Sequence, residues 1–241
     1  MKTNDYNYKH FGFKPYEDSA GRFLFERFEG PKIGTIAPDF AATMLDKKMI
    51  KLSDLRGKIV VLEAGSSTCP ATIGTTNDMQ KLVLKYPDIA FLLLYVREAH
   101  PGERVPAYTS FNEKLSCAQR FYEEEHDNRI IVVDDLDGST HKRYGLFPNF
   151  IYVINPQGYV AWRTPWNVPE RLDKVLASMR GNPKTRFTEE YLLPDVKHVG
   201  FRAFRRAGWK AIVDVITNIP RGIWIRYRLK KLVANREKNV V

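Results

Sequence analysis

Three short apolar segments, each followed by a segment with helical spacing or a turn, constrain the fold of this chain more than any other feature. They lie within residues 58–66, 88–100 and 129–135. Each holds a run of β-branched or aliphatic residues, which is the pattern of a strand buried on both faces of a parallel sheet. The intervening residues 70–86 and 108–126 repeat apolar side chains at helical intervals. The order β-α-β-α-β therefore predicts parallel strands joined by helices.

The segments that follow predict a mixed sheet. Residues 148–164 indicate a hairpin that turns at residues 155–158, and residues 168–181 indicate a closing helix. Residues 37–58 contribute two short strand-like pieces. A hairpin beside parallel strands predicts an α/β three-layer sandwich with a mixed central sheet.

Three parts are expected along the chain. Residues 1–36 form an irregular arm, rich in Tyr and Phe, that packs over the core. Residues 37–182 form the α/β domain, and residues 183–241 form a basic, amphipathic, helical extension.

The net charge of +10 belongs entirely to the end of the chain. Residues 197–241 hold 12 Lys and Arg against 2 Asp and Glu, whereas the rest of the chain holds 26 of each sign. This asymmetry indicates a separate interaction role for the extension. Helical spacing there places apolar residues on one side and Lys and Arg on the other, and Pro220 predicts a break between two helices. The expected apolar stripe consists of Phe201, Phe204, Gly208, Ile212, Val215 and Ile219.

Three partners fit such an extension. An anionic membrane surface suits a basic amphipathic helix that lies in the interface. Packing on the chain's own domain, or on a second subunit in a homodimer, fits the same pattern. Nucleic acid is the weakest choice because no recognition module accompanies the charge.

The expected compartment follows from what the sequence lacks. No stretch of about 18 uninterrupted apolar residues is present, and the first residues have no apolar signal region. Two cysteines do not make a disulfide framework. We therefore expect a cytoplasmic protein, peripheral at the membrane if the extension docks there.

Cys69 is the candidate nucleophile. It lies between the end of a predicted strand and the start of a predicted helix at Pro70, where open α/β sheets form their sites. Free backbone N–H groups and the helix dipole at that point favour a thiolate, so a pKa below about 8.5 is expected. The alternative is an inert buried cysteine, which is common.

Several motifs in one order give the chain a family resemblance. Residues 33–181 resemble the iodothyronine deiodinases, which have the thioredoxin fold, in "GSSTCPATI", "LYVREAHP" and the long segment from "VVDDLDGST" to "VPERLDKVL". In that family selenocysteine occupies the position of Cys69. Pro148 takes the place of the cis proline that faces the active residue in the thioredoxin fold. This chain differs in having sulfur in place of selenium, and we expect it to lack an N-terminal membrane anchor.

The resemblance implies a role for each matching residue. Cys69 takes the place of the nucleophile, and Glu98 and His100 take those of the catalytic acidic residue and histidine lining the site. The substrate-binding positions implied in the same way are Tyr95, Arg163 and Ser66.

The implied chemistry is that of a thiol-dependent oxidoreductase. A thiolate attacks a soft electrophile, and the family match points to reductive dehalogenation of a halogenated aromatic molecule. His100 would deliver the proton that the ring carbon needs. We expect no bound cofactor, an external thiol as reductant, and no metal, since no Cys or His pair has ligand spacing.

Three other functions compete with this interpretation. The first is a peroxiredoxin-like peroxidase. Its usual signature has Pro and Thr at the positions of Leu62 and Ser66, so the sequence disfavours it. Disulfide exchange lacks a second cysteine near Cys69, so only Cys117, in a predicted helix, remains as a resolving thiol. The third rival is a membrane-docked binding protein whose cysteine is vestigial.

Overall fold

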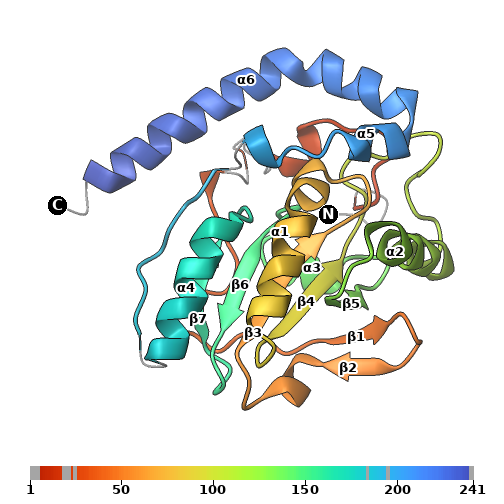
Figure 1. Cartoon of the computed structure of the whole chain (residues 1–241). Helices are drawn as coiled ribbons and strands as arrows, with labels where there is room; N and C mark the ends of the chain where they lie inside the picture. The colour runs from red at the N-terminus through yellow and green to blue at the C-terminus, as the bar shows by residue number, and fades with distance from the viewer. Residues whose placement is uncertain (1–5, 18–22, 24–25, 183–184, 194–195, 239–241) are drawn as a thin grey trace.

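A seven-stranded mixed sheet forms the centre of the molecule (Figure 1). The computed structural model describes residues 6–17, 23, 26–182, 185–193 and 196–238. The sheet order is β2-β1-β5-β4-β3-β6-β7. The strands are β1 (Ala41–Met44), β2 (Met49–Lys51), β3 (Val60–Gly65), β4 (Ala90–Tyr95), β5 (Ile130–Val133), β6 (Ile151–Ile154) and β7 (Val160–Thr164).

Strand pairing confirms the predicted mixed sheet. The three apolar segments become β3, β4 and β5, which pair in parallel in the middle of the sheet. β6 pairs antiparallel with β3, and β7 pairs antiparallel with β6. The hairpin turns at Gly158, whose φ of 86° favours a residue without Cβ.

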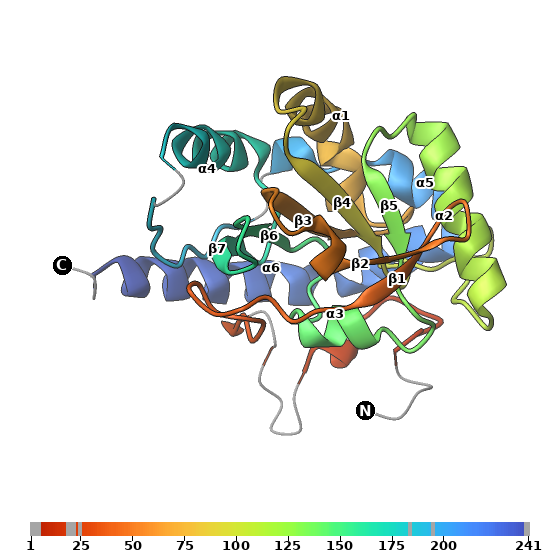
Figure 2. The ribbon, with the colours of Figure 1, turned by 90° about the horizontal axis from the view of Figure 1, so that it is seen from below.

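Three helices cover one face of the sheet, as Figure 2 shows. They are α1 (Pro70–Lys85), α2 (Phe111–Glu125) and α4 (Pro169–Gly181). Strand residues of one parity, such as Val61 and Phe91, pack against α1 and α4. Apolar side chains at helical intervals and at alternate strand positions thus meet in one layer.

The N-terminal arm covers the opposite face together with the short helix α3 (Ser139–Arg143). Tyr16, Phe23 and Phe28 share an apolar cluster with Leu62 and Leu92, so the expected packing over the core is confirmed for the described part of the arm. Residues 1–5, 18–22 and 24–25 of the predicted arm lie outside the described residues. Short 3₁₀ turns occur at Lys14–Tyr16 (η2), Leu52–Leu55 (η4) and Val196–His198 (η5).

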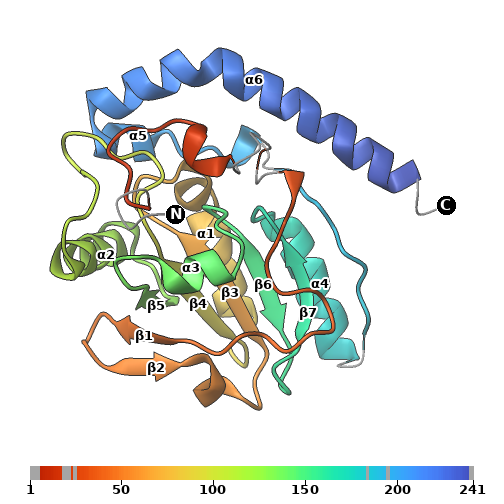
Figure 3. The same cartoon turned by 180° about the vertical axis from the view of Figure 1, so that it is seen from behind.

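The C-terminal extension arches over the end of the sheet where α1 begins (Figures 1 and 3). It consists of α5 (Arg202–Ala207) and the long helix α6 (Trp209–Lys238). The predicted break at Pro220 is wrong, because α6 continues through it and the chain breaks instead at Gly208, with φ of 107°. Pro220 is exposed to solvent, and α6 is curved (Figure 1), so the helix bends rather than ends where the proline removes a hydrogen bond.

Candidate active site

An apolar cavity of about 290 Å³ lies beyond the carboxyl ends of β3 and β4. Its floor includes Cys69 and His100, and Pro148 and Trp166 form part of one wall. The remaining walls come from the arm, from α6, and from Leu193, His198 and Val199. Its main apolar contributors are Phe11, Phe13, Tyr16, Leu193, Ile225 and Leu229.

Cys69 occupies the position immediately before α1, as the sequence predicts. Its N–H donates to the carbonyl of Ser66 at 3.2 Å, and its own carbonyl accepts from the N–H of Ile73 at 3.0 Å. The side chain is 2% exposed and faces the cavity. The backbone of the strand end and the first helical turn together fix the direction of the sulfur.

The expected low pKa of Cys69 is wrong for this structure. Burial raises the pKa of the thiol, while hydrogen bonds from Thr72 and from the N–H of Ala71 lower it by less, and the charge of Glu63 raises it further. Desolvation disfavours an anion, and here it outweighs the helix terminus. The resting group is therefore a thiol at neutral pH.

His100 also faces the cavity, and its ring is held by two aromatic side chains. The ring centroid lies 4.0 Å from that of Phe11 and 5.1 Å from that of Phe204. Burial lowers the pKa of His100 to about 3, so the imidazole is neutral at pH 7. Its Nδ1 atom is buried without a hydrogen-bond partner. Because no carboxylate compensates for the burial, the pKa of His100 lies well below the range near pH 7 that suits a general acid.

Glu98 does not line the cavity, although the resemblance implies a catalytic position for it. Its carboxylate lies beneath the loop before Cys69 and accepts from Thr68 N–H at 2.8 Å, Thr68 Oγ1 at 2.5 Å and Ser67 Oγ at 3.1 Å. Tyr95 and Tyr108 donate their hydroxyls to the same carboxylate. Because all of these donors are buried, Glu98 acts as an anchor for the loop.

Tyr95 and Ser66 are the two residues that the resemblance places at the substrate. In the structure they help Glu98 to hold the loop before Cys69. The Tyr95 hydroxyl donates to Glu98 at 2.6 Å and accepts from the N–H of Ser67 at 3.3 Å. Ser66 Oγ accepts from the N–H of Ala99 at 3.2 Å and so ties β3 to the segment that carries His100. Neither residue contributes to the cavity surface.

Arg163 does not line the cavity, and its expected contact with a substrate stays a prediction. The guanidinium is fully buried under the arm, where it donates to the carbonyls of Gly30 at 2.7 Å, Pro31 at 3.0 Å and Phe28 at 2.9 Å. It also pairs with Glu189. These contacts fasten the arm and the segment after α4 to β7.

Pro148 contributes to the cavity wall, but its peptide bond is trans, since the described residues contain no cis peptide. The cis geometry implied by the resemblance is therefore wrong here. Gly145 and Leu146, with φ of 106° and 63°, reverse the chain before the proline. Cys117 lies outside this cavity, in a smaller one of about 160 Å³ shared with Ser67 and Arg120.

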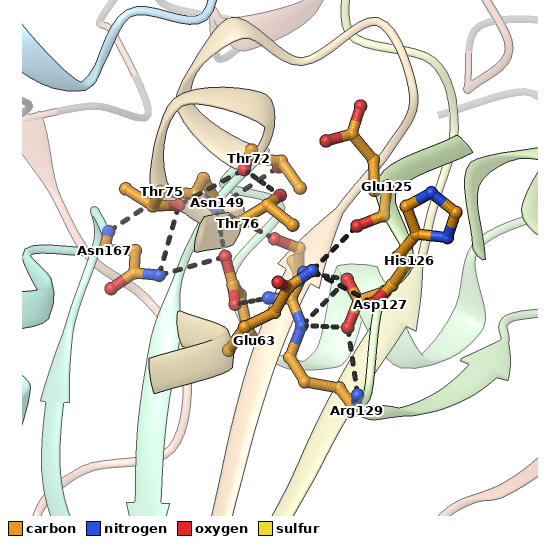
Figure 4. A network of polar contacts seen from close by, with 12 residues as sticks. Glu63, Thr72, Thr75, Thr76, Glu125, His126, Asp127, Arg129, Asn149 and Asn167 are labelled. Atoms are coloured by element: carbon orange, nitrogen blue, oxygen red, sulfur yellow. Dashed lines mark hydrogen bonds and ion pairs between the residues drawn. The ribbon is translucent and has the colours of Figure 1, made fainter. Parts of the chain in front are cut away.

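A buried polar network lies beneath the first turn of α1 (Figure 4). Glu63 of β3 pairs with Arg129 and accepts from Asn149 at 2.8 Å and Asn167 at 3.0 Å. Arg129 is paired in addition with Asp127. Burial raises the pKa of Glu63, and the charge of Arg129 opposes that rise. Sequence reasoning missed this network, although a lone Glu inside an apolar strand was a signal for it.

The cavity walls were also missed, because they come from segments remote in sequence from Cys69. The aromatic composition of the arm was the available signal for Phe11, Phe13 and Tyr16. No periodicity indicated that the inner face of α6, with Ile225 and Leu229, would form the roof. In the part of the chain that the structure describes, no group of three His, Cys, Asp or Glu side chains is placed to hold a metal ion.

Comparisons with known proteins agree on family and fold. A model of the iodothyronine deiodinase family matches residues 21–177. Thyroxine 5-deiodinase of Sparus aurata is 26% identical over 141 residues, which are 53% of this chain and 52% of that protein. The human thyroxine 5-deiodinase is 30% identical over 105 residues, or 39% of this chain and 34% of that protein.

A third relative and two solved structures extend the comparison. Type II iodothyronine deiodinase of Neoceratodus forsteri is 23% identical over 176 residues, or 60% of this chain and 65% of that protein. The matched segments thus span between about a third and two thirds of these relatives. An uncharacterized Geobacillus kaustophilus protein has a TM-score of 0.52 at 16% identity, covering 70% of this chain and 96% of that one.

A Bacteroides thetaiotaomicron protein proposed as a protein disulfide isomerase has a TM-score of 0.51 at 21% identity, covering 64% of this chain and 92% of that one. These structures show a thioredoxin-like fold. The family match covers more than half of the chain in one continuous segment and includes Cys69 and His100. The chain therefore belongs to the iodothyronine deiodinase family.

Proposed function

We propose that this protein is a thiol-dependent oxidoreductase that removes a halogen from an apolar aromatic substrate. The observation that carries the proposal is the apolar cavity, which Cys69 and His100 line together. The Nδ1 atom of His100 is buried without a hydrogen-bond partner among the described residues. Aromatic walls such as Phe11 and Trp166 suit a flat ring.

The resting protonation states of the two residues are complementary. Burial raises the pKa of Cys69 and lowers that of His100, so both are neutral and one proton resides on sulfur. We infer that the imidazole accepts this proton as the sulfur attacks, and then donates it to the ring carbon. His100 is thus a base first and an acid second, which a resting imidazolium would prevent.

The proposed reaction balances with an external thiol as reductant. An S–X bond forms while the C–X bond breaks, and the electron pair remains on the ring carbon, which takes the proton from His100. Sulfur is thereby oxidised to a sulfenyl halide. One thiol displaces halide to form a mixed disulfide, and a second thiol releases Cys69 and leaves as the disulfide. The sum is aryl halide plus two thiols giving arene, hydrogen halide and disulfide.

Halide release from iodinated or brominated phenols in excess dithiothreitol tests the proposal. We expect release by the native protein and by Cys117→Ser, and none by Cys69→Ser. His100→Ala should lower the rate by roughly two to four orders of magnitude. His10→Ala is the matched control, because the His10 side chain is 72% exposed.

A parallel incubation with hydrogen peroxide distinguishes the proposed dehalogenase from a thiol peroxidase. Intact mass spectrometry would detect oxygen added to Cys69. Rapid oxidation of Cys69 without any halide release would replace the proposal with a thiol peroxidase. Halide release by the Cys69→Ser variant would show that Cys69 is not the nucleophile of the proposed reaction.

A further inference from the structure

One face of α6 carries a row of large apolar side chains that point away from the domain. We call this row the outer stripe; it consists of Trp209, Ile212, Ile216, Ile219, Ile223 and Tyr227. Each of these residues is between 42% and 66% exposed. Their spacing of three and four residues aligns them along one side of the helix.

The opposite face of α6 is the one that packs on the domain. Ala211, Ile225 and Leu229 are buried, and the last two form the roof of the Cys69 cavity. The stripe expected from the sequence was therefore partly misplaced. Phe204, which was assigned to it, packs against His100 instead. The outer stripe is not needed to complete the core.

Positive charge accompanies the outer stripe. Residues 197–241 hold 12 Lys and Arg against 2 Asp and Glu, which is the whole net charge of the protein. Arg221 and Arg228 pair with Glu17 and Glu26 of the arm. The exposed Lys210, Lys230 and Lys231 form no ion pair with any described residue. At about 100° per residue, Lys230 continues the line of the outer stripe beyond Tyr227. Lys231 lies beside the edge of the stripe, and Lys210 follows Trp209 in the chain.

We propose that the outer stripe docks α6 on the surface of a bilayer that contains anionic lipid. Isoleucines flanked by Trp and Tyr enter the boundary between headgroups and acyl chains, and the lysines at both ends meet lipid phosphates. A second copy fits less well, because a two-fold interface through the outer stripe would bring these lysines of one copy near lysines of the other. In the described part of the chain no helix could cross a membrane, so the contact is interfacial.

Co-sedimentation with vesicles tests the proposal on the full chain. We expect binding to phosphatidylcholine vesicles that contain phosphatidylserine, weaker binding to phosphatidylcholine alone, and loss of binding as salt rises. Ile216→Glu with Ile223→Glu should weaken binding by roughly tenfold or more, because two carboxylates would enter the headgroup boundary. The matched control is Met49→Glu with Leu84→Glu, which changes residues that are 60% and 75% exposed elsewhere.

The charge is tested separately from the apolar contact. Lys230→Glu with Lys231→Glu should weaken binding to acidic vesicles by roughly tenfold or more. Lys58→Glu with Lys174→Glu, at exposed positions outside α6, should leave it nearly unchanged. Alkylation of Cys69 reports in every variant whether the domain is intact, so this test does not depend on dehalogenation.

Two results would overturn the proposal. The first is a full-length protein that does not co-sediment with acidic vesicles at low salt. The second is a stable dimer, measured by analytical ultracentrifugation, that Ile216→Glu with Ile223→Glu converts to monomer. That outcome would assign the outer stripe to a second copy of this chain.

Discussion

Glu98 accepts two hydrogen bonds from Thr68, one from its N–H at 2.8 Å and one from its hydroxyl at 2.5 Å, directly before Cys69 in the chain. A carboxylate at the end of β4 therefore fixes the loop that carries the candidate nucleophile. The family resemblance placed Glu98 at the site, and its geometry makes it a positioning residue.

The first prediction concerns this anchor. Glu98→Gln should lower the free energy of unfolding by about 2–4 kcal/mol, because an amide cannot accept from all of the buried donors around it. Tyr108→Phe removes only one donor and should cost about 1 kcal/mol. Urea denaturation measures both. Equal stability of native protein and Glu98→Gln would contradict the anchoring role.

The second prediction concerns the ionisation of Cys69. Because burial raises its pKa, iodoacetamide alkylation should reach half its maximal rate above the ordinary value of about 8.5. Between the unfolded and folded pKa values the unfolded chain holds fewer protons, so stability falls as pH rises there. Alkylation is measured in the Cys117→Ser variant, so that only Cys69 reacts. The Cys69→Ser variant should lack the fall in stability that the ionisation of Cys69 causes. A midpoint below about 8.5 would restore the expectation from the sequence.

The third prediction separates structure from substrate binding at Arg163. Arg163→Ala leaves the carbonyls of residues 28, 30 and 31 without their donor, so it should cost about 2–4 kcal/mol of stability and expose the arm to proteolysis. Arg180→Ala, which removes an exposed pair with Asp88, should cost less than about 1 kcal/mol. A higher KM at unchanged stability would instead mean that Arg163 contacts the substrate.

The fourth prediction concerns the close approach of α1 to the segment before α5. A Cβ on Gly74 would lie 1.7 Å from the carbonyl oxygen of His198, which is backbone and cannot rotate away. Gly74→Ala should therefore cost about 1–3 kcal/mol and displace His198 and Val199 from the cavity wall.

Gly181→Ala is the control for that substitution, because nothing lies within 4 Å of the added atom. Its stability should equal or slightly exceed that of the native protein. Urea denaturation measures the stability of both variants. The rate at which a bulky maleimide alkylates Cys69 measures how far the cavity wall is displaced. If Gly74→Ala kept the native free energy of unfolding and the native rate of Cys69 alkylation, the segment before α5 would not pack closely on α1.

The sequence by itself determined the order of elements and the place of the site. Runs of β-branched residues, helical spacing and the turn near Gly158 are local signals, and they predicted the strands from β3 to β7 with their helices. The rule that sites form beyond the ends of parallel strands then located Cys69, and the family resemblance added His100. Each of these inferences needs only neighbours in sequence.

Only the tertiary structure decided what surrounds those two residues. Arg163 binds the carbonyl of Gly30, 133 residues away, and the cavity joins Phe11 of the arm to Leu229 of α6. The pKa of Cys69 is raised because these remote segments exclude water, and desolvation then exceeds the effect of the helix terminus. Burial depends on contacts across the whole chain, so no local pattern could give its extent or the sign of its effect.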